Sequence, residues 1–407
     1  MHPAFWKGLS AVLLLCLLIQ QYPSSSWWAK HHGRQLASTQ ELLDYNDTAP
    51  TEPPKWDFDW QRDGNNHSLS AAQCDEAFPR LYHEIDRSMA YWRERDLNTQ
   101  SLELYEGNEA GLRVLVRDGQ LRVLQTKGMY RDDFRQRVTA VLHQVYRAIT
   151  AAEGTDAGFH NTELTFIVDD WPNFPQDGRD LAALSFTRNI SNRDHDRAWL
   201  MPEFNFWAAV PSAGAFADMQ AKARQYDLAI AEKVQKAVWR GVEWTNQEVR
   251  GALLAQSADQ SWADVRKMTW SNTTDFLPLH ELCRYAYVVN TEGRSWSSRL
   301  THLLNCDSVP IIHDITWTAH YYHLLHPVVN YISVHRNFSD LGHQIEYYKE
   351  HRESRQRIAD AARTMFRERY TTPAAAACYW RRLLRSWSSV AAIAPREAQG
   401  IAFEEFV

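Results

Sequence analysis

The segment from Cys283 to Cys306, CRYAYVVNTEGRSWSSRLTHLLNC, constrains the fold of this 407-residue chain more than any other. Its pattern predicts a short buried strand over Tyr285 to Asn290, a turn through Gly293, and a helix that opens with serines and Arg299. The next segment, DSVPIIH, is again apolar and β-branched, so the unit closes as strand, helix, strand. Such units hold nucleotides at the carboxyl ends of parallel strands.

The same unit predicts an anion site. Backbone N–H groups gather at a helix N-terminus, here around Ser297, and Arg299 adds a guanidinium that can bind a phosphate with two hydrogen bonds. The alternative is an ordinary crossover whose arginine is only solvated. Because the chain has no GxGxxG or Walker string, local sequence leaves both interpretations open.

Composition narrows the range of partners. A formal net charge of −6 and the lack of a basic block give no sign of nucleic acid or of an acidic membrane surface as a partner. The length is enough for two domains of ordinary size and a tail.

The N-terminus predicts a membrane anchor. After Lys7, the run GLSAVLLLCLLI is apolar over about a dozen residues, which fits a signal sequence or a short signal anchor. Trp27 and Trp28 stand where a cleavage site needs small residues, so we favour an uncleaved anchor. The expected topology is single-pass type II, with the body of the chain in the lumen.

Two features favour that luminal address. Five N-x-[ST] sequons occur, at Asn46, Asn66, Asn189, Asn272 and Asn337. Outside the apolar run, four cysteines remain, namely Cys74, Cys283, Cys306 and Cys378. An even set in an oxidising compartment predicts two disulfides, and no CxxC indicates zinc or a redox centre. Without a KDEL-type ending, Golgi residence fits better than soluble retention, so we expect the Golgi or ER membrane.

The first half of the body predicts an irregular α/β domain. Asp118 and Gly119 separate two alternating strands, which is typical of a hairpin. An amphipathic helix is expected over 132–152, and the run ELTFIV predicts a buried strand after it. Strands and helices thus alternate, but only after a hairpin.

The second half begins with another strand and helix. A strand is expected to end at Trp239, with Arg240 and Gly241 in a turn. The helix that follows is expected to be capped by Thr245 or Asn246.

Four blocks together carry a resemblance to a known family: IVDDWPNFP, WLMPEFNFW, VWRG, and the long block that starts at Cys283. In order and spacing they resemble glycosyltransferase family 90, the capsule-associated xylosyltransferases and protein O-glucosyltransferases. The similarity covers about half of the chain, from Thr165 to Trp387, and little before Glu163 carries over. The family's pattern implies that Cys283 pairs with Cys306. It also implies that Cys378, in the string CYW near the end, pairs with Cys74.

The resemblance implies a GT-B architecture, in which two Rossmann-like domains face a cleft. It also implies inverting transfer of a sugar from a UDP-sugar, without a metal or other cofactor. The boundaries that we expect are a cytoplasmic tip and signal anchor over 1–23, a stem over 24–73, an acceptor-side α/β domain over 74–235, a nucleotide-sugar domain over 236–375, and a C-terminal helix and tail over 376–407 that pack back on the body.

The resemblance also implies roles for individual residues. The aspartate before the aromatic-proline pair is the catalytic base of the family, and here it is Asp170. The residues that match the nucleotide-binding positions are Arg240, Gly241, Gly293, Ser297 and Arg299. This chain departs from the family at Arg250, which is displaced along the sequence, so the donor sugar, xylose or glucose, stays open.

The chemistry of inverting transfer fits Asp170. The acceptor hydroxyl must lose a proton as it attacks, and a carboxylate at a strand end can take it. Asp170 follows the apolar run LTFIV, and Pro172 stops the strand. Strand alternation would place Asp169 on the opposite face. The alternative for Asp170 is a strand-end Asx turn.

Two tryptophans, Trp171 and Trp207, are candidates for an aromatic floor under a sugar, with core packing as the alternative. The histidines at 313, 320, 323 and 326 do not share a helical face, so we expect no metal site there. The strings DFD, at 57–59, and DHD, at 194–196, are a weak sign of a rival metal-dependent GT-A transferase.

Two other classes of function compete with a transferase. A glycoside hydrolase would need two carboxylates across the scissile bond, but would leave the anion site around Arg299 unexplained. A non-catalytic carbohydrate-binding protein would keep the cleft without needing Asp170. For a transferase, the partners are a UDP-sugar donor and a glycan or glycoprotein acceptor.

Overall fold

The computed structural model describes residues 56–407 except 96, 106, 108, 153–160, 176–178, 210–212, 270–273 and 392–399. The predicted anchor, most of the predicted stem, and the sequons at Asn46 and Asn272 lie outside these residues. Residues Asp57–Val407 form one compact unit, and the domain boundaries expected within it stay a prediction. Across the described ranges, no helix has both the length and the apolar character that a membrane span requires.

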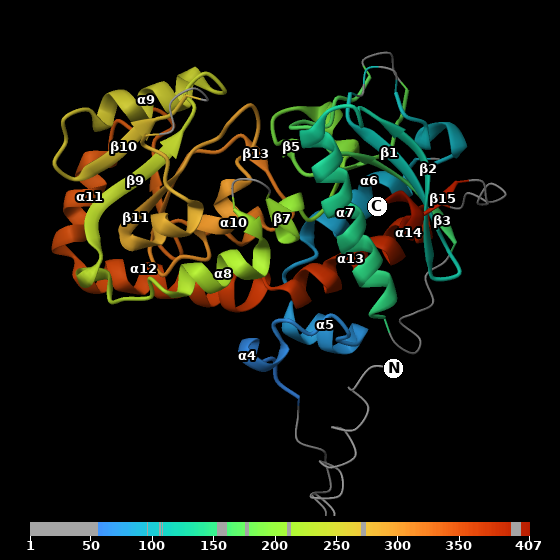
Figure 1. Cartoon of the computed structure of the whole chain (residues 1–407), viewed down its shortest axis with the longest axis horizontal. Helices are drawn as coiled ribbons and strands as arrows, with labels where there is room; N and C mark the ends of the chain where they lie inside the picture. The colour runs from blue at the N-terminus through green and yellow to red at the C-terminus, as the bar shows by residue number, and fades with distance from the viewer. Residues whose placement is uncertain are drawn as a thin grey trace, which may run out of the picture. The chain divides into compact units, whose positions relative to one another are not determined.

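The first half of the compact unit is built on a mixed six-stranded sheet with the order β15-β2-β1-β3-β4-β6 (Figure 1). Its strands are β1 (Gly111–Arg117), β2 (Gln120–Lys127), β3 (Thr162–Ile167), β4 (Leu184–Ser185), β6 (Trp199–Leu200) and β15 (Ile401–Ala402). The predicted hairpin is confirmed: β1 and β2 are antiparallel, and Asp118 and Gly119 both have positive φ, at 50° and 76°. Both angles suit a type I′ turn, which matches the twist of the strands.

Helices from both ends of the unit pack against this sheet, namely α6 (His83–Arg93), α7 (Asp132–Thr150), α13 (Pro373–Val390) and α14 (Phe403–Phe406). The short helices α4 (Trp60–Asp63) and α5 (Ala71–Ala77) lie away from the sheet, and α5 contacts α13 (Figure 1). The long helix α13 contacts α6 and α7 although it comes after the second sheet in sequence. Its Trp387 donates Nε1–H to the carbonyl of Glu163, 2.9 Å away, and thereby joins the C-terminal helix to β3.

The second half holds a five-stranded sheet in which every pair is parallel, with the order β10-β9-β11-β12-β14. Its strands are β9 (Val234–Gly241), β10 (Ala263–Lys267), β11 (Tyr285–Asn290), β12 (Val309–His313) and β14 (Ile332–Val334). Its helices are α8 (Phe216–Arg224), α9 (Gln247–Ser257), α10 (Arg299–Leu303), α11 (Leu341–Glu350) and α12 (Arg352–Met365). The predicted strand, helix, strand unit is confirmed as β11, α10 and β12, and the chain has a mixed α/β fold with parallel sheet structure.

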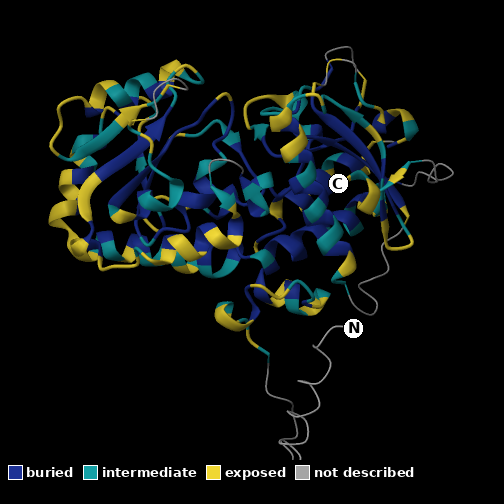
Figure 2. Ribbon diagram, in the orientation of Figure 1, coloured by how far each residue is buried: buried dark blue, intermediate teal, exposed yellow. Residues whose placement is uncertain are grey.

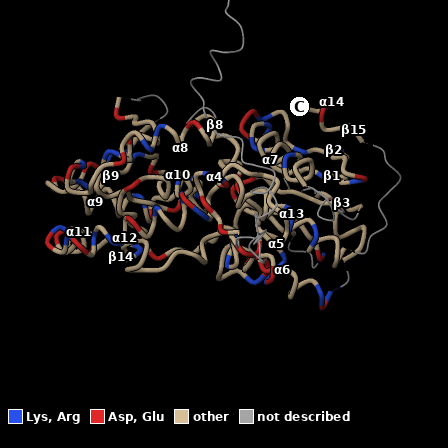
Figure 3. Tube along the Cα trace, turned by 90° about the horizontal axis from the view of Figure 1, so that it is seen from below, with Lys and Arg blue, Asp and Glu red and all other residues tan. Residues whose placement is uncertain are grey.

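Short elements connect these parts. They are the 3₁₀ helices η2 (Thr99–Leu102), η4 (Arg193–Arg197), η5 (Phe204–Phe206), η6 (Ile230–Glu232), η7 (Leu279–Arg284) and η8 (Tyr322–Leu324), the π-helix η9 (Phe366–Tyr370), and the two-stranded pairs β5 (Arg188–Asn189) with β13 (Trp317–Thr318) and β7 (Ala208–Ala209) with β8 (Gly214–Ala215). The inner strands β1, β3, β11 and β12 are almost wholly buried, whereas β2, β10 and β15 are mostly half-buried or exposed (Figure 2). Basic and acidic residues alternate along the described chain, in line with the lack of a basic block (Figure 3).

Two local expectations change, and a third is confirmed. The strand expected to end at Trp239 continues through Arg240 and Gly241, because β10 pairs with both residues in register. The helix expected to open with serines begins only at Arg299 and has five residues. By contrast, the helix after β9 is capped as expected, since the side chain of Asn246 accepts the N–H of Val249.

Both implied disulfides are confirmed. Cys74 of α5 is bonded to Cys378 of α13, across 304 positions of sequence. Cys283, just before β11, is bonded to Cys306, just after α10. All four half-cystines are buried. The first bridge ties the start of the compact unit to its last long helix, and the second holds together the unit that the sequence singled out.

Candidate active site

One cavity of about 840 Å³ collects the predicted site residues. This volume lies within the range of about 300 to 1,000 Å³ that small-molecule sites occupy. Its lining comes from the loop after β3, from α7, and from the carboxyl-terminal ends of β9 and β11. All six residues predicted to be catalytic or nucleotide-binding line it: Asp170, Arg240, Gly241, Gly293, Ser297 and Arg299.

Asp170 lies in the loop after β3 and forms an ion pair with Arg137 of α7, with 3.1 Å between Oδ1 and Nη2. Its neighbour Asp169 instead bonds within the loop: Oδ1 accepts the N–H of Asp170 at 2.7 Å, and Oδ2 accepts Nδ2–H of Asn173 at 3.0 Å. These bonds hold the loop through Asp169 rather than through Asp170. The Asp170 carboxylate is left to line the cavity.

Asp169 and Asp170 do not lie on opposite faces, as strand alternation had led us to expect. Strand β3 ends at Ile167, so alternation no longer governs the two aspartates, and both line the large cavity. Burial raises the pKa of Asp169 above its ordinary value, and the charge of Asp170 adds to this rise. The two carboxylates thus differ in surroundings, one held in a turn and one paired with Arg137.

Two arginines in the cavity have no ion pair with a carboxylate among the described residues. Burial lowers the pKa of Arg299 to about 10, and burial together with the charge of Arg299 lowers the pKa of Arg250 to about 9. Arg299 also has a buried Nη1 without a hydrogen-bond partner. Arg250 donates to the backbone carbonyls of Glu292 and Val242, at 3.0 and 2.8 Å. A bound diphosphate would supply the missing negative charge.

Two glycines make room for these arginines. A β-carbon on Gly241 would lie 2.6 Å from Cζ2 of the Trp239 ring and 3.2 Å from Nη2 of Arg299, and one on Gly293 would lie 3.0 Å from Nη2 of Arg250. A larger residue at 241 would therefore displace the Trp239 ring first, and one at 293 would press on the Arg250 guanidinium. Glycine at these two predicted nucleotide-binding positions leaves room for the groups that line the cavity.

Arg240 lines the cavity and also forms an ion pair within the protein. Its Nη2 lies 2.8 Å from Oδ1 of Asp264 on the neighbouring strand β10, and its Nε donates to the carbonyl of Asp275 at 2.9 Å. Its charge is therefore already compensated within the protein. The ion pair of the alternative interpretation is present, and a phosphate contact by Arg240 stays a prediction.

The anion site also owes less to a helix dipole than the sequence indicated. Helix α10 has only five residues, and the side chain of Ser298 at its N-cap makes no capping hydrogen bond. So short a helix has a small dipole. The positive charge comes mainly from Arg299 and Arg250. Sequence reasoning had noted Arg250 only as a displaced residue, because its neighbour Arg299 lies 49 positions further along the chain.

Two further polar groups at the cavity were not singled out from the sequence. Asn205 and His302 both line it and are almost fully buried. Oδ1 of Asn205 and both ring nitrogens of His302 have no hydrogen-bond partner. Burial, with a contribution from the charge of Arg299, lowers the pKa of His302 to about 4, so its ring is neutral at pH 7. These atoms are free to hydrogen-bond a ligand.

The two predicted tryptophans lie in different surroundings. Trp171 lines a smaller cavity that adjoins the large one. Trp207 lines neither cavity: its ring stacks on His143, with centroids 4.6 Å apart, and Arg147 lies 4.2 Å from its ring centroid. Trp207 is half-buried, and its ring packs against His143 and Arg147 rather than lining the cavity.

The rival metal-dependent interpretation finds little support. Asp194 and Asp196 lie in the short helix η4, where they pair with arginines rather than follow a buried strand. Asp59 caps α4 by accepting the N–H groups of Gln61 and Arg62. In the described part of the chain, no three His, Cys, Asp or Glu side chains converge as metal ligands would. Independence from metal stays a prediction.

Comparison with known proteins adds independent findings. The profile of Glycosyl transferase family 90 matches residues 71–403. Protein O-glucosyltransferase 2 of Danio rerio is 25% identical over 184 residues, which cover 43% of this chain and 36% of that protein. O-glucosyltransferase rumi of Drosophila pseudoobscura pseudoobscura is 23% identical over 285 residues, which cover 64% of this chain and 68% of that protein. The chain thus spans about a third of one relative and about two thirds of the other.

A solved structure described as a glycosyltransferase from Rickettsia africae ESF-5 also matches. It covers 51% of this chain and 63% of that chain, with a TM-score of 0.31 and 10% sequence identity. That likeness is too low to establish a shared architecture.

Proposed function

Because this chain belongs to glycosyl transferase family 90, we propose that it is an inverting glycosyltransferase that moves a sugar from a UDP-sugar to a hydroxyl group of a glycan or glycoprotein. One observation carries the proposal: two buried arginines without carboxylate partners share a cavity with the carboxylate of Asp170. A transferase needs both features, since one stabilises the departing diphosphate and the other accepts a proton.

In the proposed reaction, the acceptor oxygen attacks the anomeric carbon from the face opposite the UDP. The acceptor O–H bond breaks and its proton passes to Asp170. A new bond forms between the acceptor oxygen and the anomeric carbon. The bond from that carbon to the diphosphate oxygen breaks, and UDP leaves with the electron pair. Arg299 and Arg250 stabilise the charge that develops on the leaving diphosphate.

The rest of the cavity has an apolar part and a polar part. Apolar side chains suited to the uracil ring lie along one part of it, namely Met268, Phe276, Leu277, Leu279 and Leu282. Asn205 and His302 offer unused hydrogen-bonding atoms for the donor sugar or ribose. Since both arginines supply positive charge at the diphosphate, we propose that the reaction needs neither metal nor another cofactor.

The relatives bear on the donor and the cellular location. Both named relatives are O-glucosyltransferases by name, which favours UDP-glucose over UDP-xylose as donor. The sequons and the two buried disulfides support an oxidising luminal compartment. We further propose a GT-B arrangement of the two sheets and a type II anchor in the Golgi or ER membrane.

A panel of UDP-sugars, scored for UDP release with and without acceptor, tests the proposal. UDP-glucose and UDP-xylose are compared, each with excess EDTA and with Mn²⁺. We expect release that EDTA leaves unchanged. Activity that vanishes with EDTA and returns with Mn²⁺ would contradict a metal-independent mechanism. UDP binding without any release would favour a carbohydrate-binding protein, and lack of UDP binding would favour a hydrolase.

A further inference from the structure

A smaller cavity of about 420 Å³ adjoins the large one. Its volume also lies within the range of small-molecule sites, about 300 to 1,000 Å³. Three residues line both cavities, namely Arg131, Asp169 and Arg294, so the two spaces meet at these side chains. Asp170 follows Asp169 directly, which places a ligand of the smaller cavity beside the proposed base.

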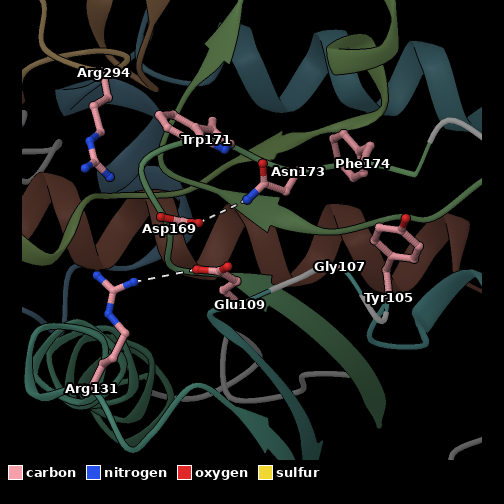
Figure 4. A pocket seen from close by; sticks show the side chains of 9 residues that line it. All are labelled: Tyr105, Gly107, Glu109, Arg131, Asp169, Trp171, Asn173, Phe174 and Arg294. Atoms are coloured by element: carbon pink, nitrogen blue, oxygen red, sulfur yellow. Dashed lines mark hydrogen bonds and ion pairs between the residues drawn. The ribbon is translucent and has the colours of Figure 1, made fainter. Parts of the chain in front are cut away.

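Aromatic rings form part of its wall. Figure 4 shows Tyr105 and Phe174 at one end and Trp171 along the side, toward Arg294. Phe174 is buried, whereas Trp171 and Tyr105 are only half-buried. A pyranose ring presents a face of C–H groups, and the flat face of an aromatic side chain is its usual apolar partner in a polar pocket.

Polar groups alternate with these rings. In Figure 4, Asn173 donates to Asp169, and Arg131 pairs with Glu109, whose Oε2 lies 3.7 Å from Nη1. Both carboxylates keep unused acceptor capacity, and the exposed guanidinium of Arg294 keeps donors for a ligand. Arg131 also bonds Asp133 through Nε and Nη2, at 3.1 and 2.8 Å. Acidic side chains thus offset both arginines, which favours a neutral ligand over an anion.

These features point to one class of ligand. We infer, building on the function proposed above, that the smaller cavity binds a neutral pyranose residue of a glycan, which is the acceptor. Its reacting hydroxyl lies at the end lined by Arg131 and Arg294, next to the large cavity. The remainder of the glycan leaves past Tyr105 and Phe174. A folded protein acceptor would instead need a broad surface, of about 800 Å² on each side.

Binding without a donor tests this inference separately from turnover. The probes are the methyl glycosides of glucose, galactose, mannose and xylose. Their binding to the full chain is measured by saturation-transfer NMR. We expect at least one glycoside to bind. The variant Trp171→Ala should weaken that binding by about tenfold or more, and Trp171→Phe should keep most of it, since a flat ring remains. Tyr105→Ala is a second variant at the opposite end.

Tyr130→Ala is the matched control, because Tyr130 is an aromatic residue that is 80% exposed and lines neither cavity. It should bind the glycosides as the unaltered protein does. Unchanged UDP affinity in each variant shows that it has folded. The inference is overturned if no glycoside binds, if Trp171→Ala and Tyr105→Ala bind as well as the control, or if only a folded, disulfide-bonded protein serves as acceptor. In each case, UDP release from the donor would still stand as evidence for the transferase.

Discussion

The guanidinium of Arg137 lies 3.1 Å from the carboxylate of Asp170, and a second nitrogen of the same group donates to the carbonyl of Val168 at 3.0 Å. One side chain of α7 thus holds the loop after β3 on both sides of Asp169. Because the helix fixes the loop, the proposed base is oriented before substrates bind.

Replacement of Asp170 by Asn tests its role as the base. The amide keeps the size of the side chain but cannot accept the proton, so kcat should fall by roughly 10² to 10⁴ while UDP still binds. Asp169→Asn should be much milder, since Asp169 mainly accepts hydrogen bonds within the turn. Steady-state kinetics and calorimetry of UDP binding measure both effects. Near-normal transfer by Asp170→Asn would rule out this assignment.

Three arginine variants separate phosphate binding from structure. Arg299→Ala and Arg250→Ala should each weaken UDP binding by about 1.5 to 3 kcal/mol, the scale of a hydrogen bond to a charged group. Arg240→Ala should instead lower the free energy of unfolding and leave UDP affinity little changed, because it breaks the pair with Asp264. Calorimetry and urea unfolding report the two quantities. Equal losses of UDP affinity in all three variants would return Arg240 to the nucleotide site.

The buried carboxyl of Glu203 predicts a pH dependence of stability. Burial raises its pKa to about 7, against hydrogen bonds from Thr301 and Trp296, the latter at 2.8 Å. The folded state therefore keeps a proton that the unfolded chain loses above its ordinary pKa of 4.5. Glu203 by itself should lower the free energy of unfolding by about 3 kcal/mol as the pH rises from about 4.5 to 7. Buried histidines whose pKa is lowered, such as His302, act in the opposite direction over this range, because the unfolded chain binds a proton that their folded form does not. The contribution of Glu203 is therefore the difference between the parent protein and a variant.

Glu203→Gln should remove this part of the slope, because an amide does not titrate. Urea unfolding at several pH values between 5 and 8 measures it. Glu346→Gln is the control: its side chain is exposed and pairs with Lys349, so the slope of the parent protein should persist. If the difference in unfolding free energy between the parent and Glu203→Gln does not change with pH, Glu203 is not the titrating group.

The two disulfides should contribute unequally. In the chain-entropy model, a bridge across 304 positions restricts the unfolded chain more than one across 23, by about 2 kcal/mol. Loss of Cys74 and Cys378 to Ala should therefore cost more than loss of Cys283 and Cys306. Peptide mapping without reductant should find both pairs linked, and urea unfolding compares the double variants. Free thiols at these positions in secreted protein would argue against the pairing.

Local patterns predicted most elements that position the site. The strand over Tyr285 to Asn290, the hairpin at Asp118 and the helix capped by Asn246 depend on neighbours a few residues away, so periodicity and turn chemistry suffice to find them. The start of α10 was missed because serines favour both caps and loops. Sequence alone thus placed Gly293 in the turn after a strand and Arg299 near the start of a helix.

What each arginine does was decided only by tertiary structure. Arg240 and Arg299 both match family positions, yet β10 brings Asp264 to the first and no carboxylate to the second. Likewise, Arg250 lies beside Arg299 because α9 packs next to the end of β11, where Arg250 donates to the carbonyl of Glu292. A charge is compensated or left free by residues that are distant in sequence, and only the register of the sheet brings those residues into contact.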